Sequence, residues 1–313
     1  MALYLVTGGA GFIGSHLRDA LIARGDRVRV LDDLSTDHLS NLPPGIDFLK
    51  GDIADPEAAA KATQDVDGCF HLAAIASVER GVNDWTGTHK ANLTGAITIF
   101  DALRRTGAPV VYASSAAVYG DCQTIPIDET ADRSPLSAYG ADKLGCELHA
   151  RVASHVHGIP AVGLRFFNVY GPRQDPKSPY SGVISISGVI SIFCQRIGDG
   201  APIAIFGDGG QTRDFVHVSD VVKALLAAMA LKPTDAPVFN VCTGQATSVL
   251  DLAHLIADLA GKPLNHSFQP PRAGEIRHSL GNPARLRATL HAADPVQLRT
   301  GLAGVLAWMA ASR

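Results

Sequence analysis

The chain has 313 residues, of which 46% are hydrophobic and 18% are charged. This composition is typical of a globular protein and argues against disorder. The 27 lysine and arginine residues nearly balance the 30 aspartate and glutamate residues, which leaves a formal net charge of −3. Such a balance argues against nucleic acid or an anionic membrane as a partner bound through bulk charge, although it leaves room for a local cationic pocket.

The cysteines and the start of the chain favour a cytoplasmic protein. No two of the five cysteines have the C-x-x-C spacing of a zinc or redox site, and an odd number cannot pair completely. We therefore expect free thiols and a reducing compartment. Residues 1–6 have no basic region before their apolar stretch, so we interpret them as a strand rather than a signal peptide. The sequence has no uninterrupted run of about 18 apolar residues, so we expect no membrane span. The 12 histidines show no metal-ligand spacing.

Short apolar runs alternate with helical segments in the first half of the chain. Residues 3–7 and 27–31 are apolar runs, and the segment 12–24 between them has helical spacing. This is a β-α-β unit, the building block of a parallel sheet. The alternation predicts further strands at 47–49, 68–72, 110–113 and 161–166, and helices at 92–104 and 139–155. The expected fold is an α/β, doubly wound parallel sheet of the Rossmann type.

The pattern changes near residue 170. A loop at 171–176 is followed by expected strands at 202–206 and 239–241, an apolar helix at 221–229, and a proline-containing end with two short helical patterns. We divide the chain into a domain of residues 1–170 and a smaller, substrate-facing region of residues 171–313. Elements of the second region are expected to join the main sheet. Within it, residues 181–186 are repeated identically at 187–192, which indicates a local duplication.

A glycine-rich loop, Gly8-x-x-Gly11-x-x-Gly14, joins the first strand to the first helix. Glycines let the backbone approach a ligand closely, and a helix N-terminus offers free N–H groups to a pyrophosphate. Asp32 ends the second strand, where a carboxylate can accept hydrogen bonds from ribose hydroxyls and repel a 2′-phosphate. With Asp33 beside it, this pattern predicts a binding site for NAD rather than NADP.

Two other strand ends carry residues suited to the adenosine half of such a cofactor. Asp52 can accept a hydrogen bond from the adenine amine, and Ala73 and Ala74 are small enough to lie beneath the ribose and phosphates. Because the carboxyl ends of parallel strands line the ligand crevice, we expect these residues close to the glycine loop.

The spacing of Tyr139 and Lys143 predicts a catalytic pair, because residues four apart on a helix lie on one face. A phenol has a reference pKa of about 10 and is a poor base at neutral pH, but a neighbouring ammonium favours the phenolate. Ser115, at the end of an expected strand, can orient a substrate hydroxyl. Together the three residues predict removal of a proton from an alcohol as hydride leaves the same carbon.

These features together resemble the extended short-chain dehydrogenase/reductase family. Within it they are most similar to the NAD-dependent nucleotide-sugar epimerases and dehydratases, and to the UDP-glucose 4-epimerase group in particular. The resemblance runs from Leu3 to about Leu290. Its motifs are TGGAGFIG at 7–14, LDDLS at 31–35, GDIAD at 51–55, HLAA at 71–74, SSAAVYG at 114–120, YGADK at 139–143, LRFFNVYGPRQ at 164–174, RDFVHVSD at 213–220 and PRAGE at 271–275.

The resemblance assigns roles to individual residues. It implies that Ser115, Tyr139 and Lys143 are catalytic. The positions implied to contact NAD are Gly8, Gly11, Phe12, Ile13, Gly14, Asp32, Asp33, Leu34, Ser35, Asp52, Ile53, Leu72, Ala73, Ala74, Asn92, Tyr139, Lys143 and Phe167. Those implied to contact substrate are Ser115, Asn168 at a phosphate, Phe206 beside uracil, Arg213 and Arg272 at the diphosphate, and Ser279 near the sugar C2 group. Guanidinium groups suit phosphate oxygens on chemical grounds as well.

One departure from the family pattern bears on the reaction. Ala116 and Ala117 follow Ser115, where the family's dehydratases carry an acid pair, so dehydration is not expected. The resemblance then implies an epimerase that inverts C4 of a UDP-hexose through a 4-keto intermediate, with tightly bound NAD. The duplication at 181–192 falls near the nucleotide in this family and is expected to alter contacts with the base.

The resemblance also bears on substrate range and assembly. The small Ser279 leaves room for an N-acetyl group, so the N-acetylated sugars are candidate substrates beside UDP-glucose and UDP-galactose. A homodimer is implied, through the helices expected at 92–104 and 139–155.

Three alternatives stay open on sequence grounds. The protein could be a nucleotide-sugar 4-reductase or decarboxylase on the same fold, an epimerase of another sugar, or a non-catalytic dinucleotide-binding regulator. Ser115, Tyr139 and Lys143 argue against the regulator, because it has no use for an activated phenol. A reduced cofactor absorbing near 340 nm after addition of a sugar nucleotide would separate an enzyme from a regulator.

Overall fold

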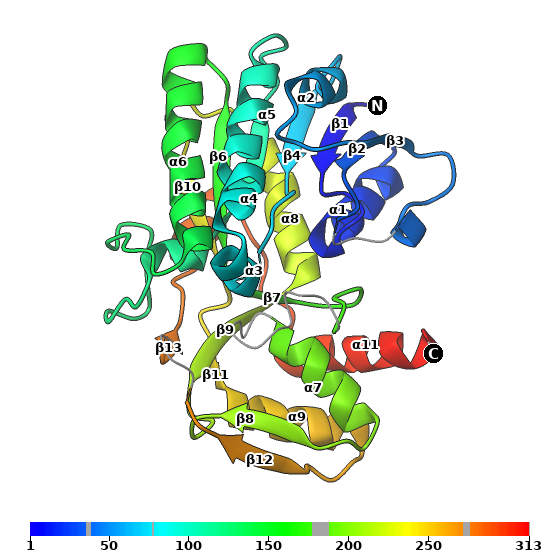
Figure 1. The fold of residues 1–313 in the computed structure, drawn as a ribbon, viewed down its shortest axis with the longest axis vertical. Helices are drawn as coiled ribbons and strands as arrows, with labels where there is room; N and C mark the ends of the chain where they lie inside the picture. The colour runs from blue at the N-terminus through cyan, green and yellow to red at the C-terminus, as the bar shows by residue number, and fades with distance from the viewer. Residues whose placement is uncertain (36–38, 77, 177–187, 272–275, 313) are drawn as a thin grey trace.

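A parallel sheet of seven strands forms the centre of the protein, in the order β10-β6-β5-β4-β1-β2-β3 (Figure 1). The structure is a computed structural model and describes residues 1–35, 39–76, 78–176, 188–271 and 276–312. The sheet strands are β1 (Leu3–Thr7), β2 (Arg27–Asp32), β3 (Asp47–Lys50), β4 (Gly68–His71), β5 (Val110–Ser115), β6 (Ala161–Phe166) and β10 (Val238–Val241). The order is that of a doubly wound Rossmann fold, which confirms the fold expected from the sequence.

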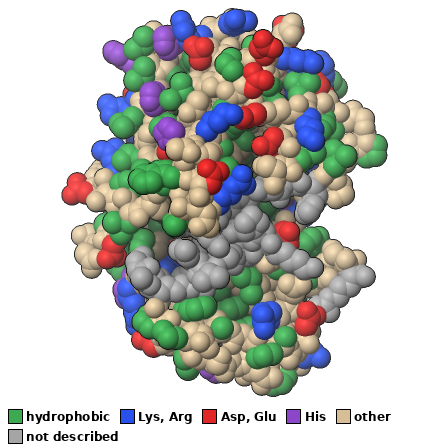
Figure 2. Space-filling model, viewed as in Figure 1, with side chains coloured by type: hydrophobic (Ala, Val, Ile, Leu, Met, Phe, Trp, Pro, Cys, Tyr) green, Lys and Arg blue, Asp and Glu red, His purple; other side chains and the backbone are tan. Residues whose placement is uncertain are grey.

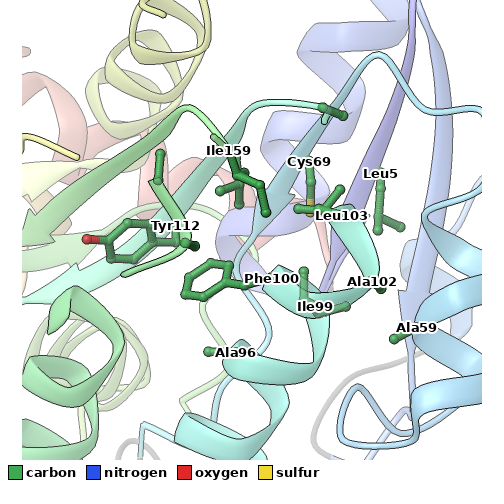
Figure 3. Packing of buried hydrophobic residues seen from close by; sticks show 14 of the residues in the cluster. Leu5, Ala59, Cys69, Ala96, Ile99, Phe100, Ala102, Leu103, Tyr112 and Ile159 are labelled. Carbon is green, nitrogen blue, oxygen red and sulfur yellow. The ribbon is translucent and has the colours of Figure 1, made fainter. Parts of the chain in front are cut away.

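Helices cover both faces of this sheet. On one face lie α2 (Pro56–Ala62), α5 (Gly95–Leu103) and α6 (Ala138–His157), and on the other α1 (Phe12–Ala23), α8 (Val218–Met229) and α10 (Ala284–Leu290). Successive strand side chains point to opposite faces, so Leu5 joins the first core and Val6 the second. Figure 3 shows the first core, where Leu5 and Cys69 lie near Ile99 and Phe100 of α5. Burial on both faces explains why strands such as β1 and β6 are nearly continuous apolar runs.

A smaller part of the chain lies below the carboxyl edge of the sheet (Figure 1). Its strands are β7 (Asn168–Tyr170), β8 (Ile203–Phe206), β9 (Thr212–His217), β11 (Ala246–Ser248), β12 (His266–Gln269) and β13 (His278–Ser279), and its helices are α7 (Val189–Gly198), α9 (Val249–Ala260) and α11 (Leu298–Ala311). Strands β7, β9, β11 and β13 share one sheet, and β8 pairs with β12. Phe193 and Ile197 of α7 pack with Leu252 and Ile256 of α9 and with Leu302 of α11.

The main sheet contains elements from late in the chain. β10 pairs with β6 in parallel, and α8 packs against the same face as α1. Residues beyond 171 therefore complete both the edge and one face of the sheet that begins at Leu3.

The helix that carries Tyr139 and Lys143 has well-defined ends. Ser137 caps the start of α6 by accepting a hydrogen bond from the Gly140 N–H, at 3.1 Å. Gly158 ends the helix in the left-handed region, at φ +67°, which a glycine adopts without strain. The remaining short helices are η1 (Leu39–Asn41), α3 (Val78–Asn83), α4 (Trp85–His89), the π turn η2 (Lys90–Thr94) and η3 (Ala116–Tyr119).

Three features expected from the sequence can be compared with the structure: the state of the cysteines, membrane-spanning helices and metal-binding clusters. All five cysteines are free thiols, and all except the partly exposed Cys122 are buried. Within the described ranges, none of the helices has the length and apolarity of a membrane crossing. The same ranges contain no cluster of three or more histidine, cysteine or acidic side chains arranged to hold a metal ion.

Candidate active site

The glycine loop lies against the end of β4 and leaves no room for side chains at two positions. Gly8 has a φ of +68°, and a Cβ atom there would lie 2.9 Å from the backbone of Ala73. A Cβ atom on Gly14 would lie 2.1 Å from the carbonyl oxygen of Gly8. The N-cap of α1 is Gly11, which supplies no side-chain hydrogen bond to the helix start. The first N–H groups of α1 therefore remain available to an anion.

A cavity of about 240 Å³ opens beside this loop, at the carboxyl edge of the sheet. Its lining includes many of the residues predicted to contact NAD, namely Gly8, Asp32, Asp33, Ser35, Asp52, Ile53, Ala73 and Ala74. The other lining residues, which the sequence analysis missed, are Gly51, Ile75, Arg80, Gly87, Lys90 and Ala91. The structure thus brings the ends of β1, β2, β3 and β4 together around one cavity.

Asp32 is buried, and two backbone N–H groups hold its carboxylate in place. Its Oδ2 accepts a hydrogen bond from Ala10 at 3.0 Å, and its Oδ1 accepts one from Leu34 at 2.9 Å. Burial raises the pKa of Asp32, and the two backbone hydrogen bonds oppose that rise. A carboxylate has about four acceptor sites, so Asp32 keeps capacity for a ligand hydroxyl. Asp33 is exposed and accepts a hydrogen bond from Ser35 N.

Asp52 forms an ion pair with Lys90 across the cavity mouth, with 2.8 Å between Oδ2 and Nζ. Desolvation raises the pKa of Asp52, but the hydrogen bond and charge of Lys90 and the hydrogen bond from Ala54 N together outweigh it, so the pKa is lowered overall. Both side chains are exposed, so the pair contributes little to stability. The sequence analysis assigned Asp52 to the adenine amine and did not foresee Lys90 as its partner.

Asn92 lies in the π turn η2 and is buried. Its Oδ1 accepts a hydrogen bond from Ile75 N at 2.7 Å, and its Nδ2 donates to Ile75 O at 3.0 Å. The side chain therefore holds the segment after β4 against the start of α5. A π turn inside a helix frequently marks a functional site. Asn92 shapes the cavity by holding Ile75, which lines it. The predicted contact with NAD would be a second role for Asn92.

The predicted catalytic residues come together at the end of β5 and the first turns of α6. The pKa of Tyr139 reflects a hydrogen bond with Ser115, whose Oγ also accepts from Ala117 N at 3.2 Å. Lys143 is buried, and its Nζ lies 5.8 Å from the centre of the Tyr139 ring. The end of β5 therefore carries Ser115, and the first turns of α6 carry Tyr139 and Lys143.

The pKa values of this group differ from one expectation. Burial raises the pKa of Tyr139 to about 12, and the hydrogen bond with Ser115 acts in the opposite direction. Burial lowers the pKa of Lys143. The expected lowering of the tyrosine pKa by Lys143 is not seen, because the ammonium lies over the ring and desolvation dominates. At neutral pH Tyr139 is therefore a protonated phenol in this structure.

His71, the first residue of the HLAA motif, supports the glycine loop from behind. Thr7 Oγ1 accepts hydrogen bonds from Leu72 N at 3.1 Å and Ala73 N at 3.2 Å, which uses both of its lone pairs. Its own proton must then go to His71 Nδ1, 2.9 Å away. Burial and the Lys143 charge lower the pKa of His71 to about 3. The neutral ring thus fixes the Leu72–Ala73 turn on which Gly8 rests.

Predicted substrate residues lie in the smaller part of the chain and at its junction with the sheet. Arg213 of β9 and Ser279 of β13 are directly paired across neighbouring strands. The buried Arg213 guanidinium donates to the carbonyls of Thr212 at 2.8 Å and Ile276 at 2.7 Å. Arg213 therefore braces the backbone next to residues 272–275. The predicted Arg272 and the part of the duplication at 181–187 lie outside the described residues.

The remaining predicted residues lie at or next to the ends of helices and strands. Gly11, Phe12 and Ile13 lie at the start of α1, Leu34 lies two residues after β2, Leu72 directly follows β4, Phe167 is buried between β6 and β7, Asn168 begins β7, and Phe206 ends β8. Gly188 of the duplicated segment is the N-cap of α7. Ala116 and Ala117 form the first turn of η3, directly after Ser115.

Charges of both signs are scattered over the face of the protein shown in Figure 2. Arginine and lysine side chains alternate there with acidic ones over both parts of the chain. On this face the charges form no single-sign band of the kind that tracks a polyanion.

The chain is similar to known proteins over its whole length. The sequence profile of the NAD dependent epimerase/dehydratase family matches residues 4–242. The UDP-glucose 4-epimerase of Mycolicibacterium smegmatis is 37% identical over 307 residues, which cover 96% of this chain and 96% of that protein. The crystal structure of UDP-glucose 4-epimerase from Thermotoga maritima with UDP-glucose has a TM-score of 0.93 and 34% identity, and covers 99% of both chains.

A second solved structure is a UDP-N-acetylglucosamine 4-epimerase. It comes from Methanobrevibacter ruminantium, in complex with UDP-N-acetylmuramic acid, and has a TM-score of 0.92 at 33% identity, covering 100% of this chain and 99% of that one. The family profile spans well over half of the chain, and the fold and the glycine loop agree with it. This chain belongs to the NAD-dependent epimerase/dehydratase family.

Proposed function

We propose that this protein is an epimerase that inverts C4 of a UDP-hexose with the help of NAD. The observation that carries the proposal is the meeting of Ser115, Tyr139 and Lys143 at the end of β5 and the start of α6, on the same carboxyl edge of the sheet as the cavity that Asp32 and the glycine loop line. The similarity to UDP-glucose and UDP-N-acetylglucosamine 4-epimerases supports it.

The residues around the cavity fit NAD. A side chain at Gly8 or Gly14 would clash with the backbone of Ala73 or of Gly8, so the glycines allow the tight loop that leads into α1, whose uncapped N–H groups can bind a pyrophosphate. The carboxylate of Asp32 suits ribose hydroxyls and repels a 2′-phosphate. When bound, NAD supplies an acceptor for hydride from C4 and a donor for its return. No net oxidation results, so no second substrate is needed.

The protein's own residues move the proton and hold the sugar. Tyr139 takes the proton of the 4-hydroxyl and later returns one, while Ser115 orients that hydroxyl through its own Oγ. Burial holds the pKa of Tyr139 at about 12, so Tyr139 becomes a base only when additional positive charge lies near its oxygen. Asn168, Arg213, Arg272 and Phe206 would hold the nucleotide diphosphate and base. Held there, the 4-keto sugar can turn its other face to the cofactor.

The assembly is proposed to be a homodimer. Leu148, Val152 and Val156 of α6 are exposed by 52%, 49% and 63%, and their spacing of four residues places them on one helix face. An exposed apolar stripe of this size marks an interaction surface, and α6 is one of the helices expected to pair. We further propose a cytoplasmic location, which suits five free thiols.

The two parts of the chain are proposed to divide the binding work. The domain of residues 1–170, completed by α8, β10 and α10, would hold NAD. The rest of the region 171–313 would hold the sugar nucleotide. This division follows the placement of the cavity beside β1 to β4 and of Arg213 and Ser279 in β9 and β13.

The function is tested by incubating the purified protein with UDP-glucose, UDP-galactose and their N-acetylated counterparts. Chromatography of the products should show interconversion of C4 epimers without accumulation of NADH at 340 nm. A net change in NADH or release of carbon dioxide would assign the protein to a reductase or decarboxylase. Failure to convert any of these sugars would contradict the proposal.

A further inference from the structure

A buried polar cluster lies directly behind the proposed catalytic residues and is not part of the proposed chemistry. It consists of Ser114, Glu147 and Arg165, whose exposed fractions are 1%, 3% and 2%. Ser114 precedes Ser115 on β5, and Arg165 is its register partner on β6. Glu147 lies on α6, four residues after Lys143 and eight after Tyr139. The cluster therefore joins the two elements that carry the catalytic residues.

The contacts within this cluster are short and directional. Ser114 Oγ donates to Glu147 Oε1 at 2.6 Å. The Arg165 guanidinium donates to both carboxylate oxygens, from Nε to Oε1 at 2.8 Å and from a terminal nitrogen to Oε2 at 2.7 Å. A two-pronged arginine–carboxylate pair fixes orientation as well as distance. Helix α6 is thus held to β5 and β6 at a defined height and rotation.

The arginine extends the cluster to the segment that follows Ser115. Another Arg165 nitrogen donates to Tyr119 Oη at 2.6 Å, and the guanidinium lies 4.7 Å from the centre of the Tyr119 ring. Tyr119 Oη donates in turn to Asn240 Oδ1 at 2.6 Å. The helix η3, whose first N–H groups include the donor to Ser115, is therefore anchored to the same arginine.

Stability alone is a weak explanation for such a cluster. Buried ion pairs are costly to desolvate, and well-packed apolar residues often replace them without loss of stability. Apolar contacts do not fix the position and orientation of one element relative to another as directional hydrogen bonds do. Ser115 and Tyr139 lie on these same two elements, β5 and α6, and a misplacement of about 1 Å in an active site can cost about 100-fold in rate.

We propose that Ser114, Glu147 and Arg165 are positioning residues that set the register of α6 against β5, and thereby the contact between Tyr139 and Ser115. The proposal rests on the proposed function for its kinetic part, because it concerns the residues assigned to proton transfer. Its structural part stands on the contacts alone. We name the three residues the helix clamp.

The test compares Ser114→Ala with Ser154→Ala in the NAD-loaded protein. Ser154 is also buried on α6, and its Oγ has no hydrogen-bond partner among the described residues, so its variant removes a buried hydroxyl away from the clamp. Ser114→Ala should keep NAD, keep KM within about twofold and lose about 10-fold in kcat. Ser154→Ala should keep both constants.

Two further readouts separate positioning from a merely structural role. The contact with Ser115 lowers the pKa of Tyr139, so its weakening in Ser114→Ala should move the limb of the pH–kcat profile that reports Tyr139 ionisation to higher pH. Amide hydrogen exchange of residues 138–143 should become faster in Ser114→Ala, with unchanged global unfolding. Glu147→Gln also removes the charge that Arg165 faces. It should therefore shift the pH–kcat profile further and speed the exchange of residues 138–143 more than Ser114→Ala does.

The outcomes also separate the clamp from the proposed function. If the wild type converts none of the four sugars but Ser114→Ala still loosens residues 138–143, the function fails and the clamp stands. If the wild type is active and Ser114→Ala matches it in kcat, pH profile and exchange, the clamp is wrong. A loss of thermal stability in Ser114→Ala with kcat and the pH profile unchanged would overturn it as well.

Discussion

Tyr139 is the proposed proton acceptor, yet its environment opposes its ionisation. Burial raises its pKa to about 12, and Ser115 supplies the opposing hydrogen bond. We predict that Tyr139→Phe folds and retains NAD but loses activity by about 10²–10⁴-fold, the usual contribution of a general acid–base group. Steady-state rates on the sugar that the wild type converts measure the loss of activity. Analysis of the nucleotide released on denaturation measures the retention of NAD.

The matched control for this variant is Tyr112→Phe. Tyr112 is also buried near the sheet, and its hydroxyl has no hydrogen-bond partner among the described residues. Its variant should retain wild-type kcat. Activity of Tyr139→Phe within about threefold of the wild type would remove Tyr139 from the mechanism.

His71 gives stability a defined pH dependence. Its pKa is about 3 in the folded protein, because of burial and the Lys143 charge, against a reference of 6.5. Between these values the unfolded chain binds more protons, so the stabilisation is complete above pH 6.5 and is lost as pH falls towards 3. We predict that acidification from pH 6.5 to pH 4.5 removes about 2 kcal/mol of unfolding free energy through His71, because the dependence approaches about 1.4 kcal/mol per pH unit only as the unfolded imidazole becomes fully protonated.

The variant that tests this dependence is His71→Asn, whose amide oxygen can still accept the Thr7 proton. It should be less stable than the wild type at pH 7, since the ring packs against Phe100, but should lose less stability on acidification. Urea unfolding curves at both pH values measure the difference. Parallel acid losses in the two proteins would show that His71 does not titrate in this way.

Ser279 is the residue on which substrate breadth is predicted to depend. It is partly buried on β13, beside Arg213 of β9. The family resemblance implies that Ser279 lies near the sugar C2 group, and a tyrosine in that place would take up the room for an N-acetyl group. We predict that Ser279→Tyr loses activity on UDP-N-acetylgalactosamine while UDP-galactose activity stays within about threefold. Equal effects on both sugars, or a wild type inactive on the acetylated sugar, would contradict this interpretation.

At the scale of elements, the start of α6 matters for both stability and chemistry. The Ser137 side chain caps the turn in which Tyr139 lies. Loss of such a cap typically costs about 1 kcal/mol. We predict that Ser137→Ala is destabilised by that amount in urea and also has a lower kcat, because the first turn of α6 frays.

Ser248→Ala provides the control for the cap. Ser248 caps α9 in the same way, by accepting a hydrogen bond from Asp251 N at 3.0 Å, in the smaller part of the chain. Its variant should lose a similar amount of stability and keep the wild-type kcat. If both variants keep the wild-type kcat, the cap of α6 has no effect on catalysis.

The elements that sequence reasoning predicts well are those with local or continuous patterns. The buried strands at 3–7 and 161–166 are found at the expected residues, because a strand covered on both faces is a plain apolar run. The helix expected at 92–104 is instead a π turn at 90–94 followed by α5 at 95–103. A π turn adds one residue to a turn and leaves no periodic mark in the sequence.

The site likewise contains residues that are close in sequence, which could be predicted to meet, and residues far apart in sequence, which could not. The glycine loop and Asp32 form one strand–turn–helix–strand unit, so sequence spacing predicts their meeting at the cavity. The Asp52–Lys90 and Glu147–Arg165 pairs join residues 38 and 18 positions apart. Arg213 and Ser279 meet through the pairing of β9 with β13. Such pairings depend on topology, which spacing along the chain does not encode.

At the scale of the whole molecule, the exposed stripe on α6 is predicted to be a dimer contact. Val152 lies at its centre, between Leu148 and Val156. We predict that the wild type has the mass of a dimer in light scattering and that Val152→Glu shifts it to the monomer, because a charge would be buried without a partner. Ala303→Glu places the same charge on an exposed position of α11 and should leave the dimer intact. A monomeric wild type would overturn the proposed assembly.

The placement of β10 beside β6 has a consequence for the synthesis of the protein. Strand β6 ends at Phe166, whereas its neighbour ends at Val241, 75 positions later in the chain (241 − 166). At translation rates of roughly 5–20 residues per second, β6 waits about 4–15 s for its neighbour. During that interval the nascent chain presents an unpaired strand edge and an apolar face that α8 has not yet covered. The nascent chain can therefore aggregate, or be bound by chaperones, until the second half of the protein has left the ribosome.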